Sequence, residues 1–300
     1  MNSAHLVLGS LSVYHRSAGE VPAKSHVKGK VKHMDLRLAG KRALVTGSSS
    51  GIGEAIVKLL AAEGVAVVVH GRSVSRANAV AEAIRARGGE AEVAPGDLTT
   101  DAGADAVAAA ALASGPIDIL VNNAGVIGFL SWTEATATDW AQIYNSNVIS
   151  GVRMIQRLVS QMRERHWGRV IQIGGGLSQQ PQAGGPNYNA SLAARHNLAV
   201  SLARELKDTG VTSNVVAPGA ILASEAARAQ LTHLAQAHGW GETWEEIEHN
   251  ATQNIAPNDV GRLGRPEEIA AAVAYLASPL ADYVSGATIR VDGGTIRSVI

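Results

Sequence analysis

A run of small residues has the composition and position of an anion-binding loop. Residues 46–53 lie between a short apolar stretch and an alanine-rich helical pattern. Small residues let backbone N–H groups approach a pyrophosphate, and the following helix presents the positive end of its dipole to the same anion. The alternative is a tight strand-to-helix turn without a ligand, but Asp97, beyond a later strand, favours a dinucleotide site. The loop residues predicted to bind are Thr46, Gly47, Ser49, Ser50, Gly51, Ile52 and Gly53.

The elements that must position this loop are short β-branched runs alternating with longer helical patterns. Several of the runs are continuously apolar, which is typical of strands covered on both faces. The alternation predicts an α/β fold with a doubly wound parallel sheet and helices on both faces. The predicted strands cover residues 43–46, 65–69, 117–121, 170–173, 211–216 and 288–291, and the predicted helices cover residues 52–63, 76–87, 140–165, 188–208 and 266–277.

Composition excludes several classes of protein. Of the 300 residues, 46% are hydrophobic and 17% charged, which provides material for a core and excludes a disordered chain. The 26 basic and 26 acidic residues cancel, so no global field favours nucleic acid. The chain has no Cys, and its longest apolar stretches fall short of the roughly 18 residues that span a bilayer. We therefore expect a cytoplasmic protein that binds neither nucleic acid nor membrane.

The first 33 residues differ from the rest of the chain. They carry five basic residues against one acidic residue and show no sustained helical or strand period. We expect them to be a disordered or extended arm, or vector-derived, since His33-Met34 matches what a common cloning site encodes. No internal repeat or low-complexity linker interrupts residues 34–300, so they are predicted to form one domain.

The loop and a second motif together resemble the short-chain dehydrogenase/reductase family. The glycines of residues 47–53 have the spacing Gly-xxx-Gly-x-Gly, and Asn122-Asn123-Ala124-Gly125 follows a later strand. The resemblance spans about residues 38–294, and its late part is most similar to the β-ketoacyl-carrier-protein-reductase-like members. It implies a Rossmann fold, a nicotinamide cofactor and hydride transfer between a carbonyl and an alcohol. Further motifs in the family's order are Asn147-Val148, Gly168-Arg169-Val170, Tyr188, Asn214, Pro218-Gly219, residues 261–268 and Val291-Asp292-Gly293-Gly294.

The residues after the second predicted strand bear on which nicotinamide cofactor binds. An Asp or Glu there would accept hydrogen bonds from the adenosine ribose and repel a 2′-phosphate. Gly71 stands at that position, and Arg72 can hold a phosphate with a charge-assisted fork. The sequence predicts NADP(H) in preference to NAD(H), with an ordinary solvated arginine as the alternative. The resemblance adds Asp97 and Leu98 beside adenine, and Asn123, Ala124, Gly125, Pro218 and Gly219 along the rest of the cofactor.

The family's catalytic set is incomplete in this sequence. The family uses a Tyr as proton donor, a Lys four residues later that lowers the pKa of the Tyr, a Ser thirteen residues upstream that binds the substrate oxygen, and an Asn. Tyr188 and Asn147 match, but the Lys position is Leu192 and the Ser position is Gly175. A tyrosine without its cation should keep a pKa near 10. The usual mechanism cannot simply be carried over.

Nearby residues offer substitutes for the missing groups. Arg195 lies seven residues after Tyr188, within about 20° of the same helix face, so it is a candidate cation. The alternative is that Arg195 faces solvent or a neighbouring subunit. Ser178 and Gln179 are candidate donors to a substrate oxygen, against a role in satisfying the loop backbone. Gly175 is a candidate substrate contact, because a missing side chain there would enlarge the pocket.

Two further regions are similar to functional parts of the family. Residues 222–259 correspond to the substrate lid, and the spacing of their histidines does not favour a metal site. The predicted helix from Tyr188 corresponds to a helix that relatives pair across a two-fold axis, so we expect a dimer or tetramer. The small residues on this helix are Ala190, Ala193, Ala194 and Ala199.

Three hypotheses follow from these residues. The first is an NADP(H)-dependent oxidoreductase acting on a small carbonyl or alcohol, with a divergent catalytic set. The second is a nucleotide-binding protein without efficient redox turnover, favoured by Leu192 and Gly175. The third is non-redox chemistry on the same scaffold, for which no residue argues directly. Tyr188, Asn147 and the phosphate loop favour the first.

Overall fold

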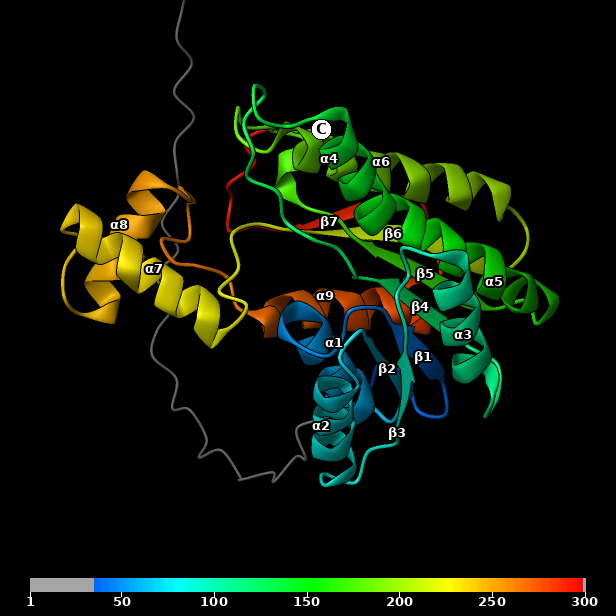
Figure 1. The fold of residues 1–300 in the computed structure, drawn as a ribbon. Helices are drawn as coiled ribbons and strands as arrows, with labels where there is room; N and C mark the ends of the chain where they lie inside the picture. The colour runs from blue at the N-terminus through cyan, green and yellow to red at the C-terminus, as the bar shows by residue number, and fades with distance from the viewer. Residues whose placement is uncertain (1–34, 299–300) are drawn as a thin grey trace, which may run out of the picture. The chain divides into compact units, whose positions relative to one another are not determined.

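The computed structural model describes residues 35–298. The chain divides into two units between residues 35 and 36, and the elements described below belong to the second. The predictions for the first 33 residues lie outside the described part. In the second unit seven strands form one parallel sheet in the order β3-β2-β1-β4-β5-β6-β7 (Figure 1). The prediction of a doubly wound Rossmann-type sheet is confirmed.

The strands are β1 (Arg42–Val45), β2 (Ala66–Gly71), β3 (Ala91–Pro95), β4 (Ile119–Asn122), β5 (Gly168–Ile173), β6 (Val211–Pro218) and β7 (Thr288–Val291). The α-helices are α1 (Gly51–Ala62), α2 (Val74–Arg85), α3 (Asp101–Leu112), α4 (Ala137–Tyr144), α5 (Ser150–Glu164), α6 (Pro186–Glu205), α7 (Glu225–His238), α8 (Trp244–Asn254) and α9 (Pro266–Ala277). Two short turns matter for the site: the π-helical turn η1 (Asn145–Ile149) and the 3₁₀ turn η2 (Gly176–Ser178).

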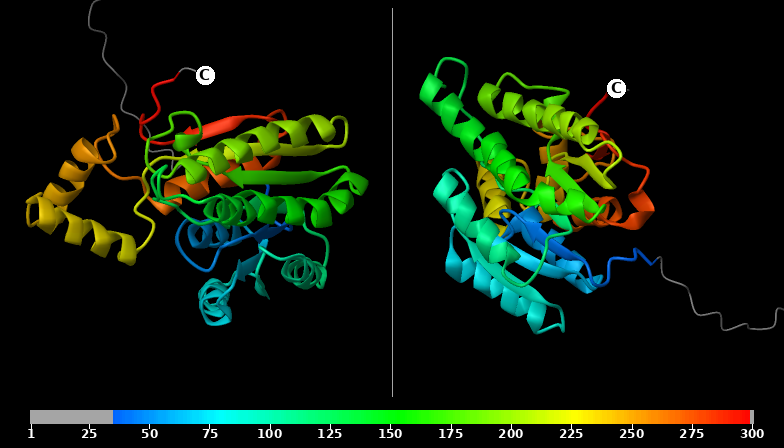
Figure 2. Two further views of the ribbon diagram at one scale, coloured as in Figure 1. Left: turned by 45° about the horizontal axis from the view of Figure 1, so that its top comes forward. Right: turned by 90° about the vertical axis from the view of Figure 1, so that its right-hand side faces the viewer.

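The sheet separates two hydrophobic cores because side chains along a strand alternate between its faces. On one face, Val45 of β1 pairs in register with a valine of β2 and one of β4, and helices α1, α2 and α9 cover them. On the other, Leu44 lies opposite Val68 and Leu120 under helices α3 and α5. Figure 2 shows the sheet between its two helix layers. Burial on both faces explains the apolar strand sequences.

The observed elements differ from the predicted ones in three places, one of which is the pair of helices α7 and α8, which were not predicted. The strand β3 and helix α3 were not predicted; β3 is a short edge strand with few β-branched residues, so its sequence signal is weak. The predicted helix over residues 140–165 is α4, η1 and α5 in succession, where an extra residue in the backbone turn interrupts the α-helical period.

The carboxyl ends of the strands form one edge, where the site is expected. The strand order reverses between β1 and β4, and such a switch point leaves a crevice above the sheet. Helices α7 and α8 form a hairpin that stands away from the layers (Figures 1 and 2). The two stems of the hairpin, the segments before α7 and after α8, are joined by a parallel bridge between Ile221 and Gly264. Within residues 35–298, no helix has both the length and the apolar composition that a membrane span requires.

Candidate functional site

The loop between β1 and α1 is held in place by neighbouring backbone and side chains. Gly47 has a positive φ of 66°, and a Cβ there would lie 2.9 Å from the Ala124 Cα, so only glycine fits. The Asn123 amide donates to the carbonyls of Thr46 and Gly47 at 2.9 and 3.0 Å. The Thr46 hydroxyl accepts the N–H groups of Asn123 and Ala124, both at 3.0 Å. These contacts tie β1 to β4 at the switch point.

A pocket opens between this loop and the ends of β2, β3 and β4. Eight predicted cofactor residues line it: Gly47, Ser49, Ser50, Arg72, Asp97, Leu98, Ala124 and Gly125. Seven others lie outside its wall: Thr46, Gly51, Ile52, Gly53, Asn123, Pro218 and Gly219. Gly71, which the sequence analysis considered in the choice of cofactor, also lines the pocket. The sequence interpretation missed the remaining lining residues, which are His70, Arg76, Gly96, Thr99, Val126, Ser146 and Ser150.

The buried His70 links the two sides of this pocket. Its Nδ1 accepts the Gly47 N–H at 2.9 Å, so the ring proton lies on Nε2, which faces the Gly96 carbonyl at 3.2 Å. Its backbone N–H donates to the Ser48 hydroxyl at 2.9 Å. Burial lowers the pKa of His70 to about 4, against smaller opposing effects of the Gly96 hydrogen bond and Asp97. The neutral imidazole therefore bridges the glycine-rich loop and the end of β3.

Charge in the pocket comes from two arginines and one aspartate. Arg72 and Arg76 are exposed, and neither forms an ion pair with a carboxylate within residues 35–298. The Asp97 carboxylate accepts the N–H and hydroxyl of Thr99 at 3.0 and 2.8 Å. These hydrogen bonds, and to a smaller degree Arg72, lower the pKa of Asp97. Arg76 lies in the first turn of α2, which begins directly after Arg72 and Ser73, and this position was the signal that could have revealed it.

Gly71 and Ser49 form a steric pair on the pocket wall. A Cβ on Gly71 would lie 2.5 Å from the Ser49 Oγ and 2.8 Å from its Cβ. An acidic residue at position 71 would therefore require Ser49 to move. As the sequence indicates, position 71 on the wall beside Arg72 carries no carboxylate that could repel a 2′-phosphate.

Tyr188 lies in the first turn of α6, which begins at Pro186 after Gly185 in the left-handed conformation. Its backbone N–H donates to the Asn187 Oδ1 at 2.9 Å. The ring is partly buried, and burial raises the pKa of Tyr188 while Arg195 lowers it by less. The phenol therefore keeps its proton at neutral pH and can act as a proton donor.

Asn147 lies in the π-helical turn η1, a kind of local irregularity that is frequent at functional sites. Its side chain accepts the Val126 N–H at 2.8 Å and donates to the Val126 carbonyl at 3.0 Å. It also donates to the Ser191 hydroxyl at 3.0 Å, and Ser191 donates to the Tyr188 carbonyl at 2.7 Å. Asn147 thus joins the end of β4 to the helix that carries Tyr188.

The Arg195 guanidinium is buried and points toward the same edge of the sheet. Its Nε, Nη1 and Nη2 donate to the carbonyls of Asn147, Ile173 and Ala124, respectively. Burial lowers the pKa of Arg195 to about 10, against the opposing effect of Tyr188, so the group stays charged at neutral pH. Three of its five N–H donors are used, which leaves two. The alternative that Arg195 faces solvent is therefore wrong.

The glycine triplet after β5 is packed by large side chains rather than open. A Cβ on Gly175 would lie 2.9 Å from the Leu192 Cδ1, so the residues at the missing Ser and Lys positions touch each other. A Cβ on Gly174 would lie 2.4 Å from the His196 Nε2, and one on Gly176 would lie 2.8 Å from the Ile296 Cδ1. In this structure the space at Gly175 is filled by Leu192.

Ser178 ends a short chain of hydrogen bonds, whereas Gln179 is exposed. The Ser178 Oγ lies 3.1 Å from the His196 Nε2, and the His196 Nδ1 lies 3.4 Å from the Thr288 Oγ1. Burial lowers the pKa of His196 to about 4, so its ring is neutral near pH 7. With Thr288 donating to Nδ1 and Nε2–H donating to Ser178, the Ser178 hydroxyl hydrogen is free for another acceptor.

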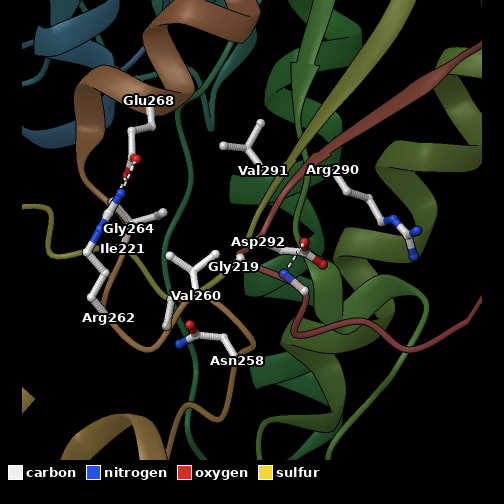
Figure 3. Close-up of a pocket in the computed structure, with 13 residues that line it drawn as sticks. Gly219, Ile221, Asn258, Val260, Arg262, Gly264, Glu268, Arg290, Val291 and Asp292 are labelled. Atoms are coloured by element: carbon white, nitrogen blue, oxygen red, sulfur yellow. Dashed lines mark hydrogen bonds and ion pairs between the residues drawn. The ribbon is translucent and has the colours of Figure 1, made fainter. Parts of the chain in front are cut away.

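A second cavity of about 360 Å³ lies at the base of the α7–α8 hairpin (Figure 3). Arg262 and Glu268 pair across its wall at 2.6 Å, while Arg290 points away from them. The Asp292 carboxylate accepts the N–H groups of Gly294 and Ile296, both at 3.1 Å. The two carboxylates thus already have partners, and the cavity is part of the hairpin's attachment. Within the described residues no group of three or more His, Cys, Asp or Glu side chains could hold a metal ion.

The model of the short chain dehydrogenase family matches residues 41–234. The chain belongs to the short-chain dehydrogenase family. Among curated short-chain dehydrogenases and related proteins, it is 37% identical to the uncharacterized oxidoreductase YvaG of Bacillus subtilis, covering 89% of this chain and 100% of YvaG. It is 35% identical to the 3-oxoacyl-[acyl-carrier-protein] reductase FabG of Vibrio cholerae, covering 86% of this chain and 98% of FabG. The resemblance predicted from the motifs is confirmed, and the chain is an enzyme of an oxidoreductase family.

Solved short-chain dehydrogenase structures agree with the fold. L-sorbose reductase from Gluconobacter frateurii, complexed with NADPH and L-sorbose, superposes with a TM-score of 0.83 at 32% identity, covering 89% of this chain and 100% of that one. An NADPH-bound short chain oxidoreductase from Pseudomonas aeruginosa with an atypical catalytic center gives a TM-score of 0.79 at 30% identity, covering 86% and 98%. Nicotinamide cofactors are thus bound by similar proteins.

Proposed function

We propose that this enzyme is an NADP(H)-dependent reductase of carbonyl compounds, in which Tyr188 donates the proton and Arg195 replaces the family's lysine. The observation that carries the proposal is the buried Arg195 guanidinium, which contacts the Asn147 carbonyl and acts electrostatically on Tyr188. Similar proteins that bind NADPH, one of them with an atypical catalytic center, support it.

The pocket at the switch point fits NADP(H). Backbone N–H groups at Ser49, Ser50 and the uncapped start of α1 would hold the pyrophosphate. Arg72 and Arg76 would hold the 2′-phosphate, since neither is engaged by a carboxylate in the described chain. When bound, NADPH would supply a hydride to the carbonyl carbon.

The chain's own residues then complete the reduction. As the carbonyl oxygen gains negative charge, the Tyr188 hydroxyl transfers its proton to it. Arg195 stabilises the phenolate that remains, because a positive charge in a dry site interacts strongly with a nearby anion. The Ser178 hydroxyl donates to the same substrate oxygen, in place of the side chain absent at Gly175.

Residues 222–259, which include α7 and α8, are proposed to close over the substrate as a lid. The parallel bridge between Ile221 and Gly264 holds the two stems together, so the hairpin would pivot as a unit. Closure would exclude water from the proton transfer.

The test of the proposed function is a pair of substitutions at Arg195. Arg195→Lys keeps the charge and should retain turnover of an activated ketone within about tenfold, whereas Arg195→Met should lose at least roughly 100-fold. The matched control is Arg204→Met, an exposed arginine on the same helix, which should leave turnover unchanged. Thermal unfolding and NADPH binding establish that each variant folds. Full activity in a folded Arg195→Met variant would overturn the assignment.

Self-association through α5 and α6 is proposed as well. An open groove between these helices is lined by Ala190, Ala193 and Ala194, small residues that allow a second helix to approach closely. Ala199, which the sequence placed on the same surface, is fully buried in the structure and does not line the groove. A light-scattering mass above one 31.0 kDa chain is expected at micromolar concentration, and a monomer would contradict it.

The second candidate function is nucleotide binding without efficient turnover. The contact between Gly175 and Leu192 favours it, because that contact fills the place of two family catalytic groups. It predicts tight NADPH binding, no turnover of any carbonyl or alcohol in a broad panel, and no effect of Arg195→Met beyond stability.

A further inference from the structure

Large apolar side chains are exposed on the loop after β4, residues 126–132, here called the apolar loop. The exposed fractions are 63% for Ile127, 85% for Phe129 and 68% for Trp132. The loop contains no charged residue, and Phe129 is the single phenylalanine of a chain with only 4% aromatic residues. Apolar side chains exposed together in this way indicate a binding surface, whereas singly exposed apolar residues are common on any protein.

The backbone of the apolar loop is fixed beside Tyr188. Val126 is held through both backbone groups by Asn147, at 2.8 and 3.0 Å. The Leu130 carbonyl accepts the Gly185 N–H at 3.0 Å, at the start of α6. Between them, a Cβ on Gly128 would lie 3.7 Å from the Tyr188 Cβ. The exposed side chains therefore stand on a loop whose backbone is anchored at both ends and passes beside Tyr188.

The position of the loop limits what can be bound there. A carbonyl oxygen must come within hydrogen-bond reach of the Tyr188 hydroxyl to be protonated, so a substituent of that carbonyl lies near the apolar loop. The side chains of Ile127 and Phe129 offer no hydrogen-bond partner to hydroxyl or carboxylate groups, and Trp132 offers only its indole N–H, so such groups would lose hydrogen bonds to water. A hydrocarbon substituent would lose no hydrogen bonds to water, and it would remove the exposed aromatic rings from water.

We propose that the substrate of this site carries an alkyl or aryl substituent next to its carbonyl, and that Ile127, Phe129 and Trp132 bind it. This inference rests on the proposed function, since it takes Tyr188 as the proton donor. It separates this enzyme from a polyhydroxy-ketone reductase, although one similar structure holds L-sorbose. It also separates the loop from an interface with a second copy of the chain, which is one outcome of the test.

The experiment compares a series of unbranched methyl ketones, from 2-butanone to 2-octanone, with dihydroxyacetone and L-sorbose. The value of kcat/KM should rise roughly fourfold per added methylene, until the loop is covered. Phe129→Ser and Trp132→Ser should each flatten this slope and lower kcat/KM for 2-octanone at least tenfold. Tyr283→Ser, a fully exposed aromatic residue elsewhere on the chain, is the matched control and should keep the slope.

A binding measurement makes the result independent of turnover. Calorimetric titration of 2-octanone and of L-sorbose into the enzyme with NADP⁺ should show tighter binding of 2-octanone, lost in Phe129→Ser. If no compound is turned over but this preference is seen, the proposed function fails and the apolar site stands. A flat chain-length series with preference for L-sorbose would overturn the proposal. So would a change in light-scattering mass in Phe129→Ser with the chain-length slope intact, which would assign the loop to a second copy.

Discussion

The cofactor half and the catalytic half of this enzyme have diverged from their family to different extents. At the ends of β1, β2 and β4, the glycine-rich loop keeps its spacing and forms a pocket largely from backbone and short side chains. Around the start of α6, the family resemblance leads us to expect a Lys and a Ser where this chain has Leu192 and Gly175, and these two residues pack against each other. Backbone-built sites require only the local fold, whereas a proton-transfer site requires particular side chains. A family motif therefore identifies cofactor binding more securely than it identifies chemistry.

The largest effect is expected at Tyr188, which tests whether the catalytic half still works. Tyr188→Phe removes the proposed proton donor while keeping the ring, so kcat should fall by roughly 10²- to 10⁴-fold. NADPH affinity should not change, because Tyr188 does not line the cofactor pocket. Steady-state kinetics with fluorescence titration of NADPH separates the two quantities. Unchanged kcat would remove Tyr188 from the mechanism.

The pH dependence sharpens the same test. Reduction needs the protonated phenol, and burial raises the pKa of Tyr188, so the reduction rate should stay level through neutral pH and fall only as pH rises through this raised pKa. Oxidation of the alcohol needs the phenolate and should increase over the same alkaline range. If the reduction rate already decreases as pH rises from 7 to 9, the pKa of Tyr188 is lowered instead of raised.

The next effect concerns the charge in the cofactor half. Arg72→Ala should weaken NADPH binding by on the order of 10- to 100-fold and leave NADH binding nearly unchanged, since a charge-assisted hydrogen bond contributes about 1.5–3 kcal/mol. Arg76→Ala should have a smaller effect of the same sign. Exposed Arg87→Ala, two residues after the end of α2, is a control. Equal affinities for both cofactors in the natural enzyme would refute the preference.

A stability effect is expected from the buried histidine of the cofactor half. The unfolded chain protonates His70 near pH 6.5, whereas the folded pKa is about 4, so the unfolded state binds more protons between these values. The free energy of unfolding should therefore fall as pH drops from 7.5 to 5, by about 2 kcal/mol for His70 alone. Urea unfolding at both pH values checks this, and His70→Gln should reduce the difference. A pH difference that His70→Gln leaves unchanged would contradict it.

The smallest effect tests whether the catalytic half can be restored. Gly175→Ser alone should destabilise the fold by about 1–3 kcal/mol, because its Cβ meets Leu192. Combined with Leu192→Lys, it should raise turnover of an activated ketone by at least roughly tenfold if the missing groups limit the rate. If Arg195 already fulfils the cation's role, the double variant gains little while Arg195→Met loses activity. An inactive double variant together with an unaffected Arg195→Met would favour the nucleotide-binding function.

The sequence by itself determined the fold class, and it predicts a phosphate loop and an incomplete catalytic set. Alternating apolar runs and helical periods are local patterns, and the glycine spacing and Tyr188 are likewise local, so they can be recognised without a structure. The short edge strand β3 could not be predicted, because Val93 is its only β-branched residue and its sequence signal is therefore weak.

Tertiary structure alone decided what fills those gaps. Leu192 closes over Gly175, 17 positions earlier in the numbering, and Arg195 binds carbonyls from three separate segments. The bridge that His70 makes to Gly47 and Gly96 likewise depends on how three strand ends meet. Such contacts join residues far apart in the sequence, so no periodicity or spacing along the chain carries a signal for them. They arise only when parallel packing brings the carboxyl ends of the strands to one edge.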